Sequence, residues 1–235
     1  MKNLPRLIIA FVAIAIPCAL LIKGIYGSFI FSFSIPILWQ VAYLNKPLSS
    51  LGIKRRSLFL SIGLGVLSGL VLGMLGGKIL QLFGLTNYAI DNTQKMGLAI
   101  GALKIEFALS GELGYQLLAM SSSLKGMLLY GLFMILAIGL GEELFWRGFI
   151  QMKIGNRVAR PVSIWITAAL FSGIHFYLFI ILPITQSIVL LVLIGTAGVV
   201  WGYLYEKTGS IWSVAISHGI AAAIIWKYFF AMPLS

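Results

Sequence analysis

GEELFWRG, residues 141–148, ends a run of nearly unbroken apolar sequence that begins near Met127. Two adjacent carboxylates and an arginine stand here where a lipid-facing helix would carry leucine. A charged side chain near the middle of a membrane helix costs roughly 2.5 to 3.5 kcal/mol on insertion scales. Because two neighbouring acids double that cost, we interpret the stretch as a candidate catalytic site inside a membrane.

The composition supports a membrane location. Of the 235 residues, 60% are hydrophobic and 10% are charged, and the mean hydropathy is +1.02. The net charge of +11 comes from basic residues that mostly flank apolar segments, and no basic stretch interleaved with aromatics suggests a nucleic-acid partner. Cys18 is the single cysteine, which excludes an intrachain disulfide and a thiolate metal cluster.

Seven apolar segments predict an all-α, multi-pass membrane protein with about seven transmembrane helices. The segments are residues 7–22, 26–44, 57–82, 127–152, 162–181, 187–205 and 210–229. Basic residues gather at Lys54–Arg56 and at Lys153–Arg160, after the second and fourth segments. This bias predicts a cell-membrane protein with its N-terminus and these two loops in the cytoplasm. The first segment also has the length of a signal peptide, but no small-x-small cleavage site follows it.

Four glycines, Gly65, Gly69, Gly73 and Gly77, recur at four-residue spacing in the third segment. Glycines at this spacing line one face of a helix, where another helix can approach closely in lipid. The pattern predicts close helix packing and no chemistry. Residues 86–123 are more mixed, and they predict either an amphipathic helix at the outer surface or a partial lid over the core.

The two histidines of the chain, His175 and His218, both fall inside predicted spans, as do Glu142 and Glu143. Counting about 1.5 Å per helical residue from the cytoplasmic ends, Glu142, His175 and His218 lie within about 10 Å of one depth. Helix tilt accommodates such a difference. We therefore expect these three side chains to converge.

The adjacent acids are expected to have different partners. Glu143 and Arg147 are four residues apart with the acid first, which favours an ion pair on one helix face. Glu142 is turned by about 100 degrees from that face. It therefore needs another partner, and His175 and His218 are the candidates.

A carboxylate beside imidazoles is suited to activating water. The acid takes a proton from water that attacks a carbonyl, and imidazole donors stabilise the oxyanion. One Glu and two His are alternatively a ligand set for zinc with an open position for water. The residues alone leave both mechanisms open. No serine-histidine-aspartate set competes with them, because the single Asp of the chain is Asp91 in the mixed region.

Glu142-Glu143 with Arg147, then Phe171 with His175 four residues later, then His218 in the last span, closely resemble the motifs of the CPBP family of intramembrane proteases. That family includes CAAX prenyl endopeptidases of the Ras-converting type and bacteriocin-processing and immunity proteins. The resemblance implies a catalytic core at residues 124–235, preceded by an N-terminal membrane region at residues 1–123. The short loops are typical of bacterial members.

The resemblance implies a role for each matching residue. Glu142 would act as general base on the hydrolytic water with help from His175, and His218 would contribute to the oxyanion site. Glu143, Arg147 and Phe171 would support them, and whether the family needs a metal is left open. One departure is Ala222, because the family usually has Asn or Asp four residues after the second histidine. Loss of one oxyanion donor typically reduces the rate by about a hundredfold to a thousandfold.

These features predict an intramembrane endopeptidase that cuts a membrane-associated peptide or protein near the cytoplasmic side of the bilayer. The alternative, motivated by Ala222, is a catalytically impaired member that acts as a binding or bacteriocin-immunity protein. A proton-coupled transporter is a third reading, since buried carboxylates and histidines also relay protons. No inverted repeat or pair of broken helices supports it.

Overall fold

The polar stretch lies on one long helix that runs from Leu124 to Gly155 in the computed structural model of the chain. The structure describes residues 44, 48–53, 58–85, 96–100, 103–107, 123–176 and 178–229. The long helix begins at Ser123, whose hydroxyl caps it by accepting a hydrogen bond from the Gly126 amide at 3.1 Å. Its 32 residues amount to about 48 Å, which exceeds the hydrocarbon core of about 30 Å and requires a tilt.

Two π-helical segments interrupt the long helix on either side of the acidic pair. Its parts are α5 (Leu124–Phe133), the π-helical Met134–Gly139, α6 (Leu140–Phe145), the π-helical Trp146–Gln151 and α7 (Met152–Gly155). Such π-helical turns are rare and frequently occur at functional sites, because they change the direction of the side chains on either side. Here they flank the six residues of α6 that carry both carboxylates.

The predicted glycine stripe packs helix α3 (Leu58–Leu82) against α11 (Ile211–Phe229). A Cβ added to Gly65 would lie 2.7 Å from the Ser213 carbonyl oxygen, and one added to Gly69 would lie 2.8 Å from that of Ser217. Successive glycines meet successive turns of α11, so the two helices run in parallel. The prediction of close helix packing is confirmed.

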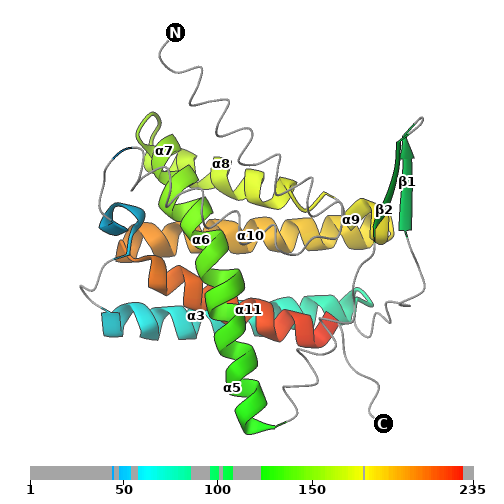
Figure 1. The fold of residues 1–235 in the computed structure, drawn as a ribbon, viewed down its shortest axis with the longest axis horizontal. Coiled ribbons are helices and arrows are strands. Elements are labelled where there is room, and N and C mark those ends of the chain that lie inside the picture. The colour runs from blue at the N-terminus through cyan, green and yellow to red at the C-terminus, as the bar shows by residue number, and fades with distance from the viewer. Residues whose placement is uncertain are drawn as a thin grey trace.

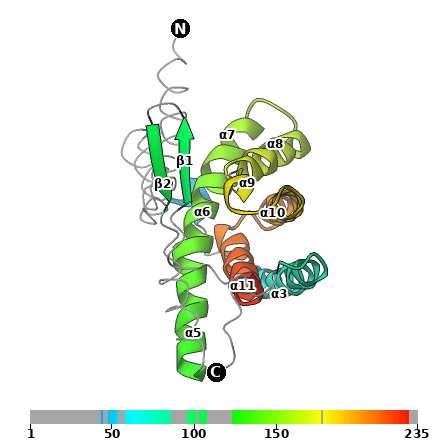
Figure 2. The same cartoon turned by 90° about the vertical axis from the view of Figure 1, so that its right-hand side faces the viewer.

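The other described helices are a 3-10 helix at Leu48–Leu51 and the α-helices α8 (Arg160–Gly173), α9 (Leu178–Ile181) and α10 (Ile184–Thr208). In Figure 1 the long helix crosses α3, α8, α10 and α11 at a steep angle. In Figure 2 the helices α3 and α10 are seen nearly end-on and α11 runs obliquely, while α5 still runs lengthwise. Helices α8, α10 and α11 therefore cross the long helix rather than run alongside it (Figure 1).

Helix α8 corrects the predicted fifth span, which was expected to be continuous over residues 162–181. It is only 14 residues long and ends at Gly173, and a turn that contains His175 separates it from α9. His175 therefore lies beyond a helix end. Its amide bonds the Ser172 carbonyl at 3.0 Å, in a tightened final turn.

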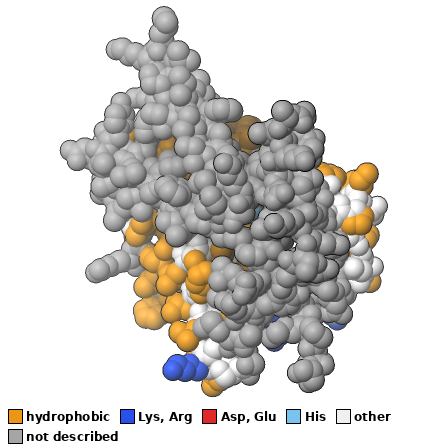
Figure 3. All heavy atoms as spheres, turned by 45° about the vertical axis from the view of Figure 1, so that its right-hand side comes forward, with side chains coloured by type: hydrophobic (Ala, Val, Ile, Leu, Met, Phe, Trp, Pro, Cys, Tyr) orange, Lys and Arg blue, Asp and Glu red, His pale blue; other side chains and the backbone are white. Residues whose placement is uncertain are grey.

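Four described helices are long and apolar enough to cross a membrane, namely Leu58–Leu82, Leu124–Gly155, Ile184–Thr208 and Ile211–Tyr228. The chain is a multi-pass membrane protein. The predicted spans at 7–22 and 26–44 lie outside the described residues, as does most of 86–123. Hydrophobic side chains make up most of the described surface visible in Figure 3, and Phe59, Leu82 and Leu124 are among the most exposed, as expected of lipid-facing residues.

Strands β1 (Met96–Ile100) and β2 (Leu103–Phe107) form an antiparallel hairpin in which Met96 pairs with Phe107. For these residues the predicted amphipathic helix is wrong. The sequence Leu103-Lys104-Ile105-Glu106-Phe107 alternates apolar and charged residues with period two, which favours a strand over a helix. The all-α class is confirmed for the apolar core.

Candidate active site

Glu143 lies at the centre of a buried polar cluster. Its Oε1 accepts hydrogen bonds from Arg147 Nη1 at 2.9 Å and from His218 Nδ1 at 2.7 Å. Glu143 and Arg147 have no exposed surface, and His218 is 6% exposed. The predicted ion pair between Glu143 and Arg147 is confirmed. Its partner on α11 was not predicted, because the sequence alone assigned both histidines to Glu142.

Glu142 approaches the same imidazole from the other side. Its Oε2 lies 3.9 Å from His218 Nε2 and is buried without a hydrogen-bond partner. The imidazole therefore lies between the two carboxylates. His218 therefore contacts Glu143 as well as facing Glu142, whereas the sequence predicted histidine only as the partner of Glu142.

The helix crossing explains this arrangement. Gly139 of the long helix and Gly219 of α11 meet at the crossing, where a Cβ on Gly139 would collide with the Ala215 carbonyl and a Cβ on Gly219 with the Ile135 backbone. Because both positions lack a side chain, α11 approaches closely enough to place His218 beside two consecutive residues. The spacing of residues within one helix does not show how closely a second helix approaches it, so the sequence did not predict this contact.

Two aromatic rings pack against the His218 imidazole. The Trp201 indole of α10 stacks on the imidazole with ring centroids 4.0 Å apart and planes inclined by 20°. Phe171 of α8 meets it edge-on at 5.9 Å. Sequence reasoning missed Trp201, since no spacing within the chain links a tryptophan on one helix to a histidine on another. Its only signal was a large aromatic residue in a mostly aliphatic segment.

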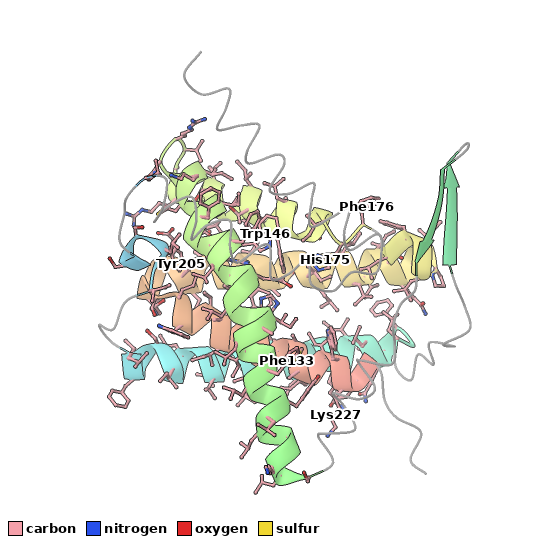
Figure 4. The ribbon with its side chains drawn as sticks, in the orientation of Figure 1. Phe133, Trp146, His175, Phe176, Tyr205 and Lys227 are labelled. Atoms are coloured by element: carbon pink, nitrogen blue, oxygen red, sulfur yellow. The ribbon has the colours of Figure 1, made fainter. Side chains whose placement is uncertain are left out.

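His175 joins the cluster through Phe171. Its Nδ1 donates a hydrogen bond to the Phe171 carbonyl at 2.8 Å, because a carbonyl oxygen can only accept. The Phe171 ring meets the His175 ring edge-on at 5.2 Å and so contacts both histidines. Figure 4 shows His175 over α10 in this view and Phe176 beside it in the same turn. His175 is half-buried, whereas Phe176 is exposed.

Arg147 also anchors the long helix to α10. Its Nη2 donates to the Gly198 carbonyl at 2.9 Å, and Gln151, one turn further on, donates to the Gly202 carbonyl at 3.3 Å. Sequence analysis missed Gln151, although it continues the four-residue spacing of Glu143 and Arg147. That spacing on one helix face was the available signal.

The zinc alternative requires Glu142, His175 and His218 to meet at one point. Among the residues that the structure describes, no three of His, Cys, Asp and Glu lie close enough together to hold a metal ion. The Nδ1 atoms of His175 and His218 are each engaged by protein oxygens, the orientation in which metal-binding histidines coordinate through Nε2.

Ala222, where the resemblance leads one to expect Asn, packs against the apolar cluster of Tyr130 and Met134. It lies one turn beyond His218 on α11. Ala222 is partly buried, and Ile138 packs against the same two side chains.

Residues 124–224 match a family model described as Rce1-like, type II CAAX prenyl endopeptidase. The matched range includes Glu142, Glu143, Arg147, Phe171, His175 and His218. It also includes Trp201 and Gln151, but not α3. No curated protein and no solved structure gives a significant match to the chain.

Proposed function

We propose, from the premise that residues 124–224 form an Rce1-like domain of the type II CAAX prenyl endopeptidase family, that this protein hydrolyses membrane-associated peptides or proteins by glutamate-activated water. The family supports an intramembrane CAAX-type endopeptidase in general. The residues and the mechanism given below are our proposal for this chain.

The observation that carries the mechanism is the gap between Glu142 Oε2 and His218 Nε2. The two atoms are 3.9 Å apart, and the buried Glu142 oxygen has no hydrogen-bond partner. This separation suits a water molecule that bridges both atoms. A buried polar atom without a partner is costly, so an oxygen left in this state favours a site that binds water or substrate.

Glu142 acts as the general base in this proposal. Its carboxylate takes a proton from the water as the water oxygen bonds to the peptide carbonyl carbon. The carbonyl π electrons move to the oxygen, and the protonated His218 donates its Nε2–H to the oxyanion. Collapse of the tetrahedral intermediate breaks the C–N bond, and Glu142 returns the proton to the leaving amine.

Glu143 and Arg147 position His218. Since Glu143 Oε1 accepts the Nδ1–H of His218 at 2.7 Å, it fixes the ring with Nε2 toward Glu142. The ion pair with Arg147 holds Glu143 in turn. His175, on the other side of Phe171, has Nδ1–H engaged by a carbonyl. This hydrogen bond fixes the orientation of the ring, and we assign to His175 the assistance to the water.

The substrate is expected to be a peptide or protein segment that reaches the site from the bilayer. The basic residues Lys153, Arg157, Arg160 and Lys207 flank the ends of α7, α8 and α10. By the positive-inside tendency this end faces the cytoplasm, and cleavage occurs near that side. We propose that the protein lies in the cell membrane with its N-terminus in the cytoplasm.

Purified full-length protein in lipid nanodiscs would test the proposal against a panel of labelled membrane peptides that includes a farnesylated CAAX peptide and an unprenylated hydrophobic peptide. We expect wild-type protein to release a defined product from at least one of them and Glu142→Gln to release none. Equal product from both proteins would refute the role of Glu142.

The second candidate is a binding or immunity protein that retains the domain without efficient catalysis. It is favoured by the apolar surroundings of Ala222. Under this hypothesis, Glu142→Gln would bind its peptide partner as tightly as wild type while no peptide in the panel is cut. Loss of cleavage with unchanged binding in the variant supports the enzyme instead, because wild type then cuts.

A further inference from the structure

The glycine stripe of α3 places a serine of the N-terminal region in hydrogen-bond contact with the layer behind His218. The Ser68 hydroxyl donates its one proton to the Leu64 carbonyl at 2.6 Å, so its Oγ accepts a hydrogen bond from the Ser217 hydroxyl at 2.9 Å. The Trp201 indole N–H donates to Ser217 Oγ at 2.9 Å. The Ser217 hydroxyl thus donates to Ser68 and accepts from Trp201. Trp201 then stacks on His218.

Gly69 makes this contact possible. It follows Ser68 directly, and its missing side chain leaves the Ser217 carbonyl oxygen only 2.8 Å from where a Cβ would be. At a larger separation of α3 and α11, the Ser68 hydroxyl would not reach across. The stripe therefore sets the hydroxyl–hydroxyl distance as well as the helix packing.

We infer that Ser68, Ser217 and Trp201 are positioning residues for His218, and that α3, which lies outside the Rce1-like domain, completes the site of that domain. The inference rests on the proposed function for its catalytic consequence. The indole has its N–H tied to Ser217, so it cannot rotate away from the imidazole without leaving a buried donor unpaired.

The order of the contacts gives each residue a distinct task. Trp201 touches the imidazole itself, Ser217 fixes the indole, and Ser68 fixes Ser217 from helix α3. Ser68 is half-buried, so its replacement by alanine or threonine needs little repacking. It is therefore the most informative residue to change.

Two measurements separate placement of His218 from catalysis. Because the chain has two histidines, ¹⁵N-histidine-labelled protein in nanodiscs gives two imidazole signal sets, and His175→Gln assigns them. Ser68→Ala should shift the His218 signals and leave those of His175 in place. With a cleaved peptide, Ser68→Ala should lower kcat by about threefold to tenfold, as expected for one lost hydrogen bond, with KM unchanged.

Ser61→Ala is the matched control, because Ser61 is a buried serine of the same helix whose hydroxyl has no hydrogen-bond partner. It should change neither the His218 signals nor kcat, and Ser68→Thr, which keeps the hydroxyl, should restore both. Trp201→Phe should shift the signals less than Trp201→Leu, since it keeps a ring on the imidazole face.

The inference is overturned if Ser68→Ala and Ser61→Ala give the same His218 signals, or if Ser68→Ala raises KM at constant kcat. Failure of the proposed function looks different. In that case no peptide is cut by wild type, while the shift of the His218 signals in Ser68→Ala still supports the positioning chain.

Discussion

The Glu143 carboxylate and the His218 imidazole, 75 residues apart in the chain, share a buried hydrogen bond of 2.7 Å. The same oxygen pairs with Arg147 at 2.9 Å. Glu143 is therefore the residue through which the long helix, α11 and, by way of Arg147, the Gly198 carbonyl of α10 are connected. Both acids keep an Oε2 that is buried without a hydrogen-bond partner, and that of Glu142 lies 3.9 Å from His218 Nε2. We therefore expect substitution of Glu143 to affect mainly stability and substitution of Glu142 to affect mainly catalysis.

Glu142→Gln is expected to abolish cleavage while preserving the fold. The amide has the shape of the carboxylate but cannot take a proton from water, and losing a general base lowers kcat by about 10²- to 10⁴-fold. Product release from a labelled peptide and unfolding in an SDS titration measure the two effects. Unchanged kcat, or unfolding of the variant at clearly lower SDS, would contradict this assignment.

Glu143→Gln is expected to destabilise the protein. It leaves the Arg147 guanidinium buried without its counter-charge, and breaking a buried pair from one side typically costs about 3 to 5 kcal/mol. Glu206→Gln is the matched control, because its partner Arg160 is 78% exposed and the two groups are 3.5 Å apart. That change should cost about 1 kcal/mol or less. Similar SDS midpoints for both variants would refute the central role of Glu143.

Gly69→Ala is expected to loosen the α3–α11 contact. Its Cβ would lie 2.8 Å from the Ser217 carbonyl oxygen, a backbone atom that cannot move aside without shifting the helix. Overpacking of this kind costs about 1 to 3 kcal/mol. Gly63→Ala on the same helix meets nothing within 4 Å and should leave the SDS midpoint unchanged or raised. If the two variants behave alike, the stripe has no packing role.

Ala222→Asn is expected to lower stability without raising activity. The amide would enter the apolar cluster around Tyr130 and Met134, and a buried polar group without a partner costs about 1 to 3 kcal/mol. Ala222→Val serves as the apolar control for added volume. An increase in kcat for the asparagine variant would show instead that position 222 reaches the reacting carbonyl.

The sequence by itself determined the membrane class, the candidate residues and one of their contacts. Mean hydropathy and apolar run length predict membrane helices because these properties depend on local composition. The Glu143–Arg147 pair and the glycine stripe depend on the spacing within one helix, which the sequence contains directly. Gln151 follows from the same spacing and was overlooked.

Only the tertiary structure decided which atoms meet across helices. The His218–Glu143 bond, the stacking of Trp201 and the contact of Ser68 with Ser217 depend on how closely α3, α10 and the long helix approach α11. Gly139, Gly219 and Gly69 set those approaches. The end of α8 at Gly173, which places His175 in a turn, was likewise not readable from an apolar run. Spacing fixes which side chains share a helix face, but the distance between two helices is set by the small residues of both, and no single segment contains that information.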